Sequence, residues 1–334
     1  MTEQHVTIIG DGGWGTALAM VLARNGRPVT VWGPFEDVIA DVRTRHENAT
    51  YLPGVPLPET IAWTSDPATA TEGCTAVILA IPTRFFNDTV RTFKPFIPAD
   101  VPVASVTKGL DRESLRVMTE VADELLAHPG VAALSGPSHA EEVARNIPTA
   151  VVAAAVDPAT AACFQTLFTD RAFRVYTATD VRGVQLGGAL KNIIAVAVGI
   201  GDGLGFGDNT RAALMTRGLA EIGRLGTALG AQPDTFAGLS GMGDLVVTCT
   251  SRHSRNRGVG ERIGRGEPID AIMGNMRQAV EGVYNCSQAL TLARRHGIEV
   301  PITEQVHAIV HEGKPPREAV EDLLARDLKP ERAD

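Results

Sequence analysis

The chain has 334 residues, of which 44% are hydrophobic, 21% charged and 5% aromatic. This length favours about two domains, and the apolar fraction excludes a disordered chain or a small scaffold held by disulfides. The 31 basic and 39 acidic side chains give a net charge of -8, which argues against non-specific binding to nucleic acid or anionic lipid.

The first half of the sequence alternates short strand-like segments with segments of helical length. Runs rich in Val and Ile predict strands, and helical spacing of apolar residues predicts helices between them. The expected strands cover 5–10, 28–33, 75–81, 101–105 and 131–135, followed by 150–155 and 173–176. The expected helices cover 16–25, 84–93, 113–127 and 139–145. This alternation favours an α/β fold with a Rossmann-like doubly wound parallel sheet.

The pattern changes near residue 180. From there the segments are long and rich in Ala and Leu, and glycine clusters interrupt them. We therefore expect a dinucleotide-binding domain over 1–182 and an all-helical C-terminal domain over 183–334. No run approaches 18 uninterrupted apolar residues, and residues 1–6 lack the order of a signal peptide. A cytoplasmic protein without a membrane span is the expectation.

The segment 10–15 reads Gly-Asp-Gly-Gly-Trp-Gly, directly after the first predicted strand. Its glycines have the G-x-G-x-x-G spacing that allows a tight turn and close approach of the backbone to a ligand. The free N–H groups of the helix that follows favour a pyrophosphate. A plain glycine-rich turn is the alternative, but the strand before and the helix after favour a dinucleotide site.

Lys191 is the only charged side chain between Arg182 and Asp202. Glycines one turn before it would let another segment approach closely. A lysine that reaches from a buried helix to water is the alternative. A desolvated lysine has a lowered pKa and can exchange a proton near neutral pH, so we predict an acid–base role for Lys191.

Polar and basic residues gather in the C-terminal half. Asp244 and Thr248 are four apart and so share a helical face, and Ser254, Arg255 and Asn256 follow among further arginines. A solvated surface or a nucleic-acid patch could have this composition, but no aromatic residue interleaves it and the chain is acidic. Guanidinium, hydroxyl and amide donors together suit one phosphate group.

Two loops after predicted strands, 105–109 and 135–140, lie where a parallel sheet binds ligands. His139 in the second loop could be a catalyst, but a solvent-facing residue at a helix start is the favoured interpretation. The four cysteines are far apart and form no C-x-x-C pair. We expect structural thiols, and neither a metal site nor a disulfide framework.

Together these segments resemble the bacterial type of NAD(P)-dependent glycerol-3-phosphate dehydrogenase over nearly the whole chain. They are GDGGWGTALA from Gly10, SVTKGL from Ser105, LSGPSHAEEVA from Leu134, VQLGGALKNIIA from Val184, GDGLGFGDN from Gly201, GMGDLVVTCTSRHSRNR from Gly241 and VEGV from Val280. The resemblance implies a Rossmann domain, a helical C-terminal domain and a homodimer. It also implies NAD or NADP as cofactor, and reversible conversion of dihydroxyacetone phosphate to sn-glycerol 3-phosphate for phospholipid synthesis.

The resemblance also implies roles for individual residues, with Lys191 as the catalytic proton acceptor. The substrate would be held by Lys108, Gly136, Ser138, Lys191, Asn192, Asp244, Thr248, Ser254, Arg255 and Asn256. The glycine motif and the resemblance together predict a cofactor site of Gly10, Gly12, Gly13, Trp14, Gly15, Phe35, Phe85, Lys108, Ala140, Arg255, Ala279 and Glu281.

The chain departs from bacterial relatives at two places. Pro34 and Phe35 replace a frequent His-Arg pair after the second strand, and Ala279 replaces a bulkier residue. A 2′-phosphate needs a cation near the end of that strand, whereas a free 2′-hydroxyl needs an acidic acceptor. Glu36 and Asp37 follow the strand. The nearest cations, Arg43 and Arg45, lie on the next segment, and the alternative is that they fold back toward the ribose. We therefore expect NADH to be used at least as well as NADPH.

Two other functions fit parts of the pattern. A hydroxy-acid dehydrogenase would share the two-domain plan, but the predicted phosphate site at 254–256 argues against it. A nucleotide-sensing protein that kept the fold and lost catalysis is the other. The joint presence of Lys191, Asp244, Thr248 and Arg255 argues against that function.

Overall fold

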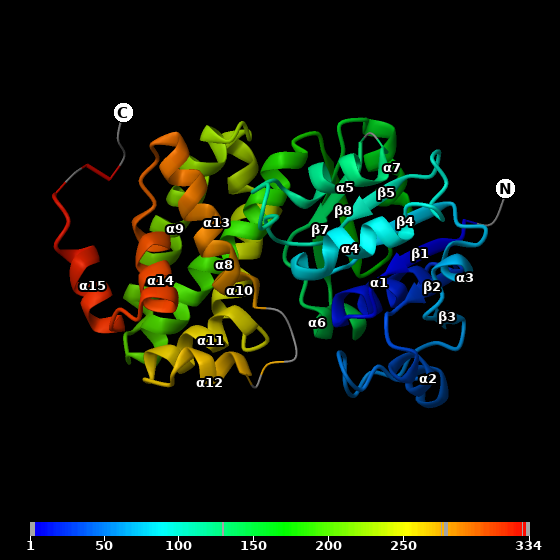
Figure 1. Ribbon diagram of the computed structural model, residues 1–334, viewed down its shortest axis with the longest axis horizontal. Helices are drawn as coiled ribbons and strands as arrows, with labels where there is room; N and C mark the ends of the chain where they lie inside the picture. Colours follow the sequence, from blue (N-terminus) through cyan, green and yellow to red (C-terminus); the bar gives the residue numbers. More distant parts are fainter. Residues whose placement is uncertain (1–3, 129, 275, 277–279, 329, 332–334) are drawn as a thin grey trace.

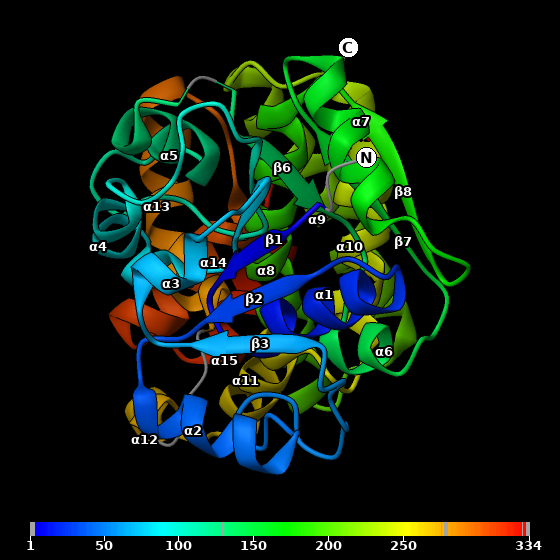
Figure 2. The same cartoon turned by 90° about the vertical axis from the view of Figure 1, so that its right-hand side faces the viewer.

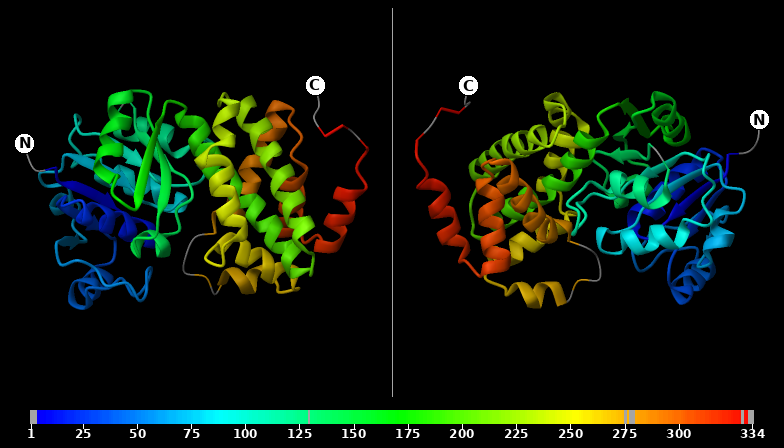
Figure 3. Two further views of the ribbon diagram at one scale, coloured as in Figure 1. Left: turned by 180° about the vertical axis from the view of Figure 1, so that it is seen from behind. Right: turned by 45° about the horizontal axis from the view of Figure 1, so that its top comes forward.

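The computed structural model describes residues 4–128, 130–274, 276, 280–328 and 330–331. Two regions lie side by side, one built around a β-sheet and one built of helices (Figures 1 and 3). The chain termini lie at opposite ends of the molecule. The last strand ends at Ala178 and a long helix begins at Val181, so the expected change of pattern near residue 180 is confirmed.

Within the described residues, eight strands form one sheet in the order β3-β2-β1-β4-β5-β6-β7-β8. They are β1 (Val6–Ile9), β2 (Val29–Trp32), β3 (Ile61–Thr64), β4 (Ala76–Leu79), β5 (Val103–Ser105), β6 (Ala132–Ser135), β7 (Thr149–Ala154) and β8 (Phe173–Ala178). Neighbouring strands are parallel except for β6 and β7. The Rossmann-like doubly wound sheet is confirmed, with this one antiparallel pair. Because the strand order reverses between β1 and β4, the ligand-binding crevice is expected at their carboxyl ends.

Helices cover this sheet and follow it in the chain. In the described part of the chain they are α1 (Gly13–Arg24), α2 (Glu36–Arg45), α3 (Pro67–Thr71), α4 (Thr83–Phe93), α5 (Met118–Leu126), α6 (Ala140–Ala144), α7 (Pro158–Phe168), α8 (Val181–Gly203), α9 (Asp208–Ala228), α10 (Asp244–Thr250), α11 (Arg255–Gly264), α12 (Ile269–Gly274), α13 (Glu281–His296), α14 (Pro301–Glu312) and α15 (Pro316–Leu324). A 3₁₀ turn (Pro233–Ala237) and a π turn (Leu239–Gly243) precede α10.

Some sequence expectations were incomplete or wrong. The short edge strand β3 and the helices α2, α3 and α7 were not predicted. The expected helix over 113–127 begins only at Met118. The residues before it form a turn instead, in which Leu110 pairs with Val117 in an isolated bridge and Leu115 has φ of +61°. Local periodicity could not reveal this turn, because the turn depends on the bridge between two separated residues.

The central strands are buried because helices cover both faces of the sheet (Figure 2). On β1, Ile8 packs in the same core as Leu18 of α1 and Phe164 of α7. The next residue, Ile9, points to the opposite face and joins the core that contains Phe86 of α4. Strands buried on both sides read as continuous Val and Ile runs, which is why the sequence revealed them.

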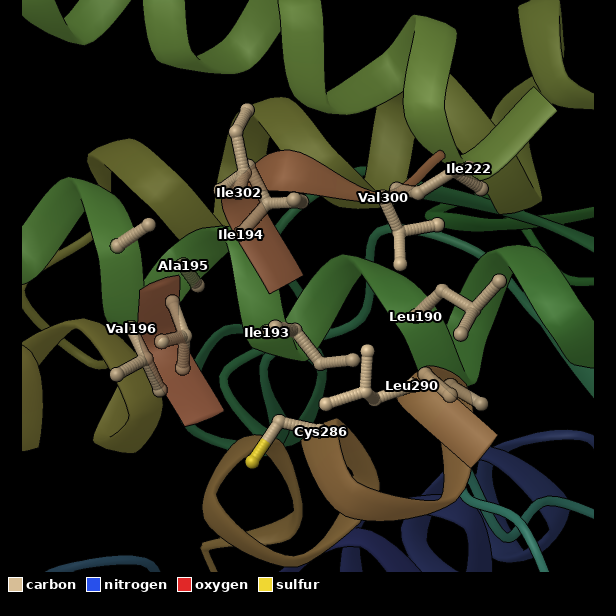
Figure 4. Packing of buried hydrophobic residues seen from close by; sticks show 14 of the residues in the cluster. Leu190, Ile193, Ile194, Ala195, Val196, Ile222, Cys286, Leu290, Val300 and Ile302 are labelled. Carbon is tan, nitrogen blue, oxygen red and sulfur yellow. The ribbon is translucent and has the colours of Figure 1, made fainter. Parts of the chain in front are cut away.

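Helix α8 runs through the centre of the helical region. Figure 4 shows Leu190 and Ile193 of α8 packed with Leu290 of α13. A Cβ added at Gly199 or Gly203 would lie 2.0 or 2.2 Å from backbone oxygens of α11, so the two helices cross in close contact. Among the described helices, α8 alone is long and apolar enough to cross a membrane, and 94% of its apolar window is buried, as in a core helix.

The four cysteines are free thiols. Cys74, Cys249 and Cys286 are buried, and Cys163 is half-buried. Burial raises the pKa of Cys249 and of Cys286 to about 12, so both are protonated and unreactive at neutral pH. This agrees with the predicted structural role.

Candidate active site

Lys191 lies in the middle of α8 with only 7% of its side chain exposed. Its Nζ donates hydrogen bonds to Oδ1 of Asp244, at 2.9 Å, and to the hydroxyl of Thr248. Both partners lie on one face of α10, as their spacing of four residues predicted. Lys191 is therefore bound to a buried carboxylate, and the alternative of a lysine reaching from the helix to water is wrong.

Asp244 holds two lysines at once. Its second oxygen, Oδ2, accepts a hydrogen bond of 2.7 Å from Nζ of Lys108. Burial acts to raise the pKa of this carboxyl, but the ammonium groups of Lys108 and Lys191 outweigh it and hold the pKa below its ordinary value. A π turn over 239–243 delivers Asp244 to this position, and such turns occur mostly at functional sites.

Burial lowers the pKa of Lys191 from 10.5 to about 8, although the adjacent Asp244 acts in the opposite direction. Lys108 adds to the lowering, because a second cation nearby disfavours the charged form. Since the buried charges are paired and hydrogen-bonded, the cluster is stable only as a unit. Its chemistry is that of an amine that both holds and releases a proton near neutral pH.

Lys108 reaches the cluster from the loop that follows β5. Its Nζ also donates to the carbonyl oxygen of Gly136, at 2.8 Å, and to Oγ of Ser138, at 3.2 Å. Gly136 has φ of +138°, which favours glycine there. The loops after β5 and β6 therefore meet at one ammonium group, as expected for neighbouring parallel strands.

The glycines before Lys191 allow this contact between the two regions. A Cβ on Gly188 would lie 2.8 Å from Oγ of Ser135 and 3.4 Å from Cγ of Lys108. A Cβ on Gly187 would lie 2.6 Å from the carbonyl oxygen of Ser240 in the π turn. The sequence prediction that small residues admit a close neighbour is confirmed.

The predicted phosphate residues lie at the start of α11. Ser254 is the N-cap and accepts a hydrogen bond from the backbone N–H of Arg257. Asn256 donates to Oδ1 of Asn192, at 3.0 Å, and accepts from the backbone N–H of Gly282. These bonds place the α11 terminus one residue along α8 from Lys191.

Arg255 is the first residue of α11. With Arg252, His253, Ser254 and Arg262 it lines a cavity of about 280 Å³. In a chain of net charge -8 this concentration of cations favours an anion in the cavity.

The glycine loop fits the pyrophosphate of a dinucleotide. Gly10 has φ of +123°, and a Cβ on it would lie 2.3 Å from the carbonyl oxygen of Ala80 at the end of β4. A Cβ on Gly15 would lie 2.1 Å from the carbonyl oxygen of Gly10. Gly12 is the N-cap of α1, makes no side-chain cap and has open space above it. The free N–H groups of α1 therefore face a gap that a phosphate can enter.

Other predicted cofactor residues lie around this loop. Gly13 faces Ala140, whose Cβ would be 3.6 Å from a Cβ on Gly13. Phe35 at the start of α2 and Phe85 on α4 are both more than half exposed. Trp14 packs near Phe173, with ring centroids 6.4 Å apart. Ala279 lies outside the described residues.

Glu281 joins the two regions at a second point. It accepts hydrogen bonds from the backbone N–H, at 3.3 Å, and from the hydroxyl of Thr83, the first residue of α4. Burial raises the pKa of its carboxyl. Glu281 thereby connects α13 with the loop after β4, at the carboxyl edge of the sheet.

Two residues near the site were missed or misjudged in the sequence. Asn48 is fully buried, and its Nδ2 donates to the backbone oxygen of Asp11, at 2.7 Å, and to Oγ1 of Thr16. No sequence signal marked it. His139 was expected to face solvent. This is wrong, because its Nε2 atom is buried and has no hydrogen-bond partner within the described residues. Burial, with the charge of Lys191, lowers its pKa.

Comparison with known proteins agrees with this arrangement. Residues 5–161 match the model for the N-terminus of NAD-dependent glycerol-3-phosphate dehydrogenase, and residues 180–321 match the model for its C-terminus. The glycerol-3-phosphate dehydrogenase [NAD(P)+] of Geobacter sp. (strain M21) is 48% identical over 331 residues, covering 98% of this chain and 99% of the relative. That of Moorella thermoacetica is 48% identical over 325 residues, covering 97% and 96%.

Solved structures give the same result. The glycerol-3-phosphate dehydrogenase of Coxiella burnetii superposes with a TM-score of 0.93 at 42% identity, covering 97% of this chain and 99% of that one. A ketopantoate reductase from Ralstonia eutropha has a TM-score of 0.63 at 16% identity, covering 95% and 100%, and shares the fold alone.

Proposed function

The chain belongs to the NAD-dependent glycerol-3-phosphate dehydrogenase family, and on this premise we propose which of its residues perform the family's reaction. The enzyme is an NAD(P)-dependent oxidoreductase that interconverts dihydroxyacetone phosphate and sn-glycerol 3-phosphate. The observation that carries the assignment of residues is the pair of lysines held by the buried carboxylate of Asp244.

Lys191 moves the proton. In the direction of reduction its ammonium group donates a proton to the C2 oxygen of the substrate, and in the direction of oxidation the neutral amine takes the proton from the C2 hydroxyl. The pKa of about 8 keeps both forms of Lys191 accessible near neutral pH. Asp244 and Thr248 hold the amine in one orientation, which the bonds from Nζ support.

Lys108 stabilises the charge on the same oxygen. Its ammonium group lies on the other oxygen of Asp244 and is fixed by Gly136 and Ser138. A preorganised cation in a buried site stabilises a developing alkoxide without reorganising during the reaction. The two lysines bound to Asp244 thus have different roles. Lys191 transfers the proton, and Lys108 stabilises the charge on the substrate oxygen.

The phosphate of the substrate binds at the start of α11. Arg255 and Ser254 line the cationic cavity, and Asn256 and Asn192 stand between it and Lys191. A phosphomonoester dianion prefers a helix N-terminus and charge-assisted hydrogen bonds from guanidinium.

The dinucleotide, when bound, supplies or accepts the hydride at C2. The chain would hold it with the glycine loop 10–15, whose open N–H groups suit the pyrophosphate. Phe35 and Phe85 expose aromatic faces at the same edge of the sheet. Lys108, Ala140, Arg255 and Glu281 would complete the site.

The division of the chain at 182–183, a homodimeric state and a cytoplasmic location are further parts of this proposal. The end of β8 at Ala178 and the family models, which leave 162–179 between them, support a division near this point, although 182–183 itself falls within α8. The other two rest on the resemblance to the family.

One assay tests the proposal. Purified protein should oxidise NADH or NADPH when dihydroxyacetone phosphate is added, and not without it. Unphosphorylated dihydroxyacetone and a 2-keto acid serve as controls for the phosphate site. Faster turnover of the 2-keto acid would support the hydroxy-acid dehydrogenase and overturn the proposed substrate, whereas dinucleotide binding without turnover would support a sensor.

A further inference from the structure

The end of β2 lacks the acid that usually contacts the adenosine ribose. In NAD sites of this fold an Asp or Glu about 20 residues after the glycines accepts a hydrogen bond from the ribose 2′-hydroxyl. Here Gly33 directly follows β2. Glu36, the nearest acid, is exposed on α2, accepts a hydrogen bond of 2.6 Å from Ser65 and pairs with Arg43. Its carboxylate is therefore already engaged at the surface.

Asp11 occupies the space that a side chain at Gly33 would take. A Cβ on Gly33 would lie 2.5 Å from Oδ2 and 2.6 Å from Cγ of Asp11. The absence of a side chain on one residue thus admits the carboxylate of the other. A carboxyl group from the glycine loop stands at the place where the side chain of a strand-end acid would begin.

The backbone of Asp11 is held by two buried donors. Asn48 donates to its backbone oxygen at 2.7 Å, and Thr16 donates to the same oxygen at 3.3 Å. These buried bonds hold the backbone from which the carboxylate of Asp11 extends. Asp11 is also part of the glycine loop itself, between Gly10 and Gly12, beside the free N–H groups of α1.

The carboxyl group of Asp11 is buried and incompletely satisfied. The residue is only 6% exposed, and its Oδ2 has no hydrogen-bond partner in the described part of the chain. Burial raises the pKa of Asp11 to about 6, which leaves it mostly ionised at pH 7. A buried carboxylate oxygen without a donor is costly, so an oxygen left in this state at a ligand site indicates a donor that arrives with the ligand.

We propose that Asp11 replaces the strand-end acid and selects NADH over NADPH. It accepts a hydrogen bond from a ribose hydroxyl of NADH and repels the 2′-phosphate of NADPH. This inference rests on the proposed dinucleotide site and names the residue that sets its cofactor preference. It also moves the source of that preference from Glu36, which follows β2, to the loop between β1 and α1.

The test compares dissociation constants of NADH and NADPH, measured by titration of the cofactor's fluorescence at pH 7.5, for the wild type and Asp11→Asn. Asparagine keeps the shape of the side chain and removes its charge. We expect NADPH to bind about tenfold more tightly to the variant, because the charge that repels its 2′-phosphate is lost. NADH should bind about threefold more weakly, because a charged acceptor becomes a neutral one.

Glu36→Gln is the matched control, since it removes the nearest other carboxylate. The ratio of the two dissociation constants should stay within about twofold of wild type in this variant. A shifted ratio in Glu36→Gln with an unchanged ratio in Asp11→Asn would overturn the inference and assign selection to α2. If Asp11→Asn does not fold, Asp11→Ser serves for the same comparison. A wild type that binds neither cofactor would instead contradict the proposed dinucleotide site.

Discussion

The glycines of segment 10–15 omit side chains where a ligand is expected to bind, whereas Lys191 and Asp244 bury two charged side chains and Lys108 half-buries a third. At the glycine loop, a Cβ on Gly10 or Gly15 would lie within 2.3 Å of a backbone oxygen. At the lysine cluster, one carboxylate holds two ammonium groups at 2.7 and 2.9 Å. The glycines of the loop whose Cβ would meet backbone should therefore reject added volume. The cluster should tolerate small changes of volume and reject loss of charge.

Loss of the amine of Lys191 should have the largest effect. Lys191→Ala should lower kcat by about two to four orders of magnitude, the range for a positioned acid–base group, and leave NADH affinity nearly unchanged. Steady-state kinetics and cofactor titration measure both quantities. Lys94→Ala, at an exposed lysine, is the control. A Lys191→Ala variant with a tenth of the wild-type kcat would remove Lys191 from the proton transfer.

Loss of the carboxylate between the lysines should come next. Asp244→Asn leaves the buried ammonium of Lys191 facing the half-buried ammonium of Lys108, which should cost about 3–5 kcal/mol in the free energy of unfolding and lower kcat by about 100-fold. Thermal denaturation and steady-state kinetics measure the two effects. Unchanged stability would mean that the lysines are not held by this charge.

The pH dependence of kcat should also differ between the wild type and Asp244→Asn. Reduction requires the ammonium form of Lys191, so wild-type kcat for reduction should fall as pH rises through about 8, the lowered pKa of this lysine. Removing the anion of Asp244 lowers this pKa further, so the fall should move to lower pH in Asp244→Asn. The pH profile of kcat between 6 and 10 checks this. A profile that moves to higher pH would contradict the electrostatic role of Asp244.

Loss of the guanidinium of Arg255 should weaken binding of the substrate's phosphate. Arg255→Ala should raise KM for dihydroxyacetone phosphate by about 10- to 100-fold, because charge-assisted hydrogen bonds to the phosphate are lost. The KM for unphosphorylated dihydroxyacetone should change little. Arg255→Lys keeps the charge and should lose less. Equal losses on both substrates would indicate a role in folding or cofactor binding.

The smallest expected effects are those of alanine substitutions at Gly12 and Gly15, which should differ in protein stability and in NADH binding. Gly15→Ala places a Cβ against the oxygen of Gly10 and should cost about 2 kcal/mol or more in stability without any ligand. Gly12→Ala meets open space, so stability of the free protein should be unchanged while NADH binds more weakly. Thermal denaturation with and without NADH distinguishes the two. Equal destabilisation of the free protein would show that the space above Gly12 is not open.

Local sequence patterns were sufficient for much of the fold. Continuous Val and Ile runs such as 76–79 revealed the strands that are buried on both faces. They missed β3 at the sheet edge, which is four residues long and only half-buried. The single charge in α8 marked Lys191, because a lone lysine in an apolar helix stands out without reference to any partner.

The sequence by itself determined the elements and the residue types of the site, because hydrogen bonding and periodicity within an element are local. Only the tertiary structure decided which groups meet. Asp244 lies 53 residues from Lys191 and 136 from Lys108, and its contact with both depends on how α10, α8 and the β5 loop cross. The contact of Asp11 with Gly33 depends likewise on the pairing of β1 with β2. Burial, which lowers the pKa of Lys191 and raises that of Asp11, also follows from this packing.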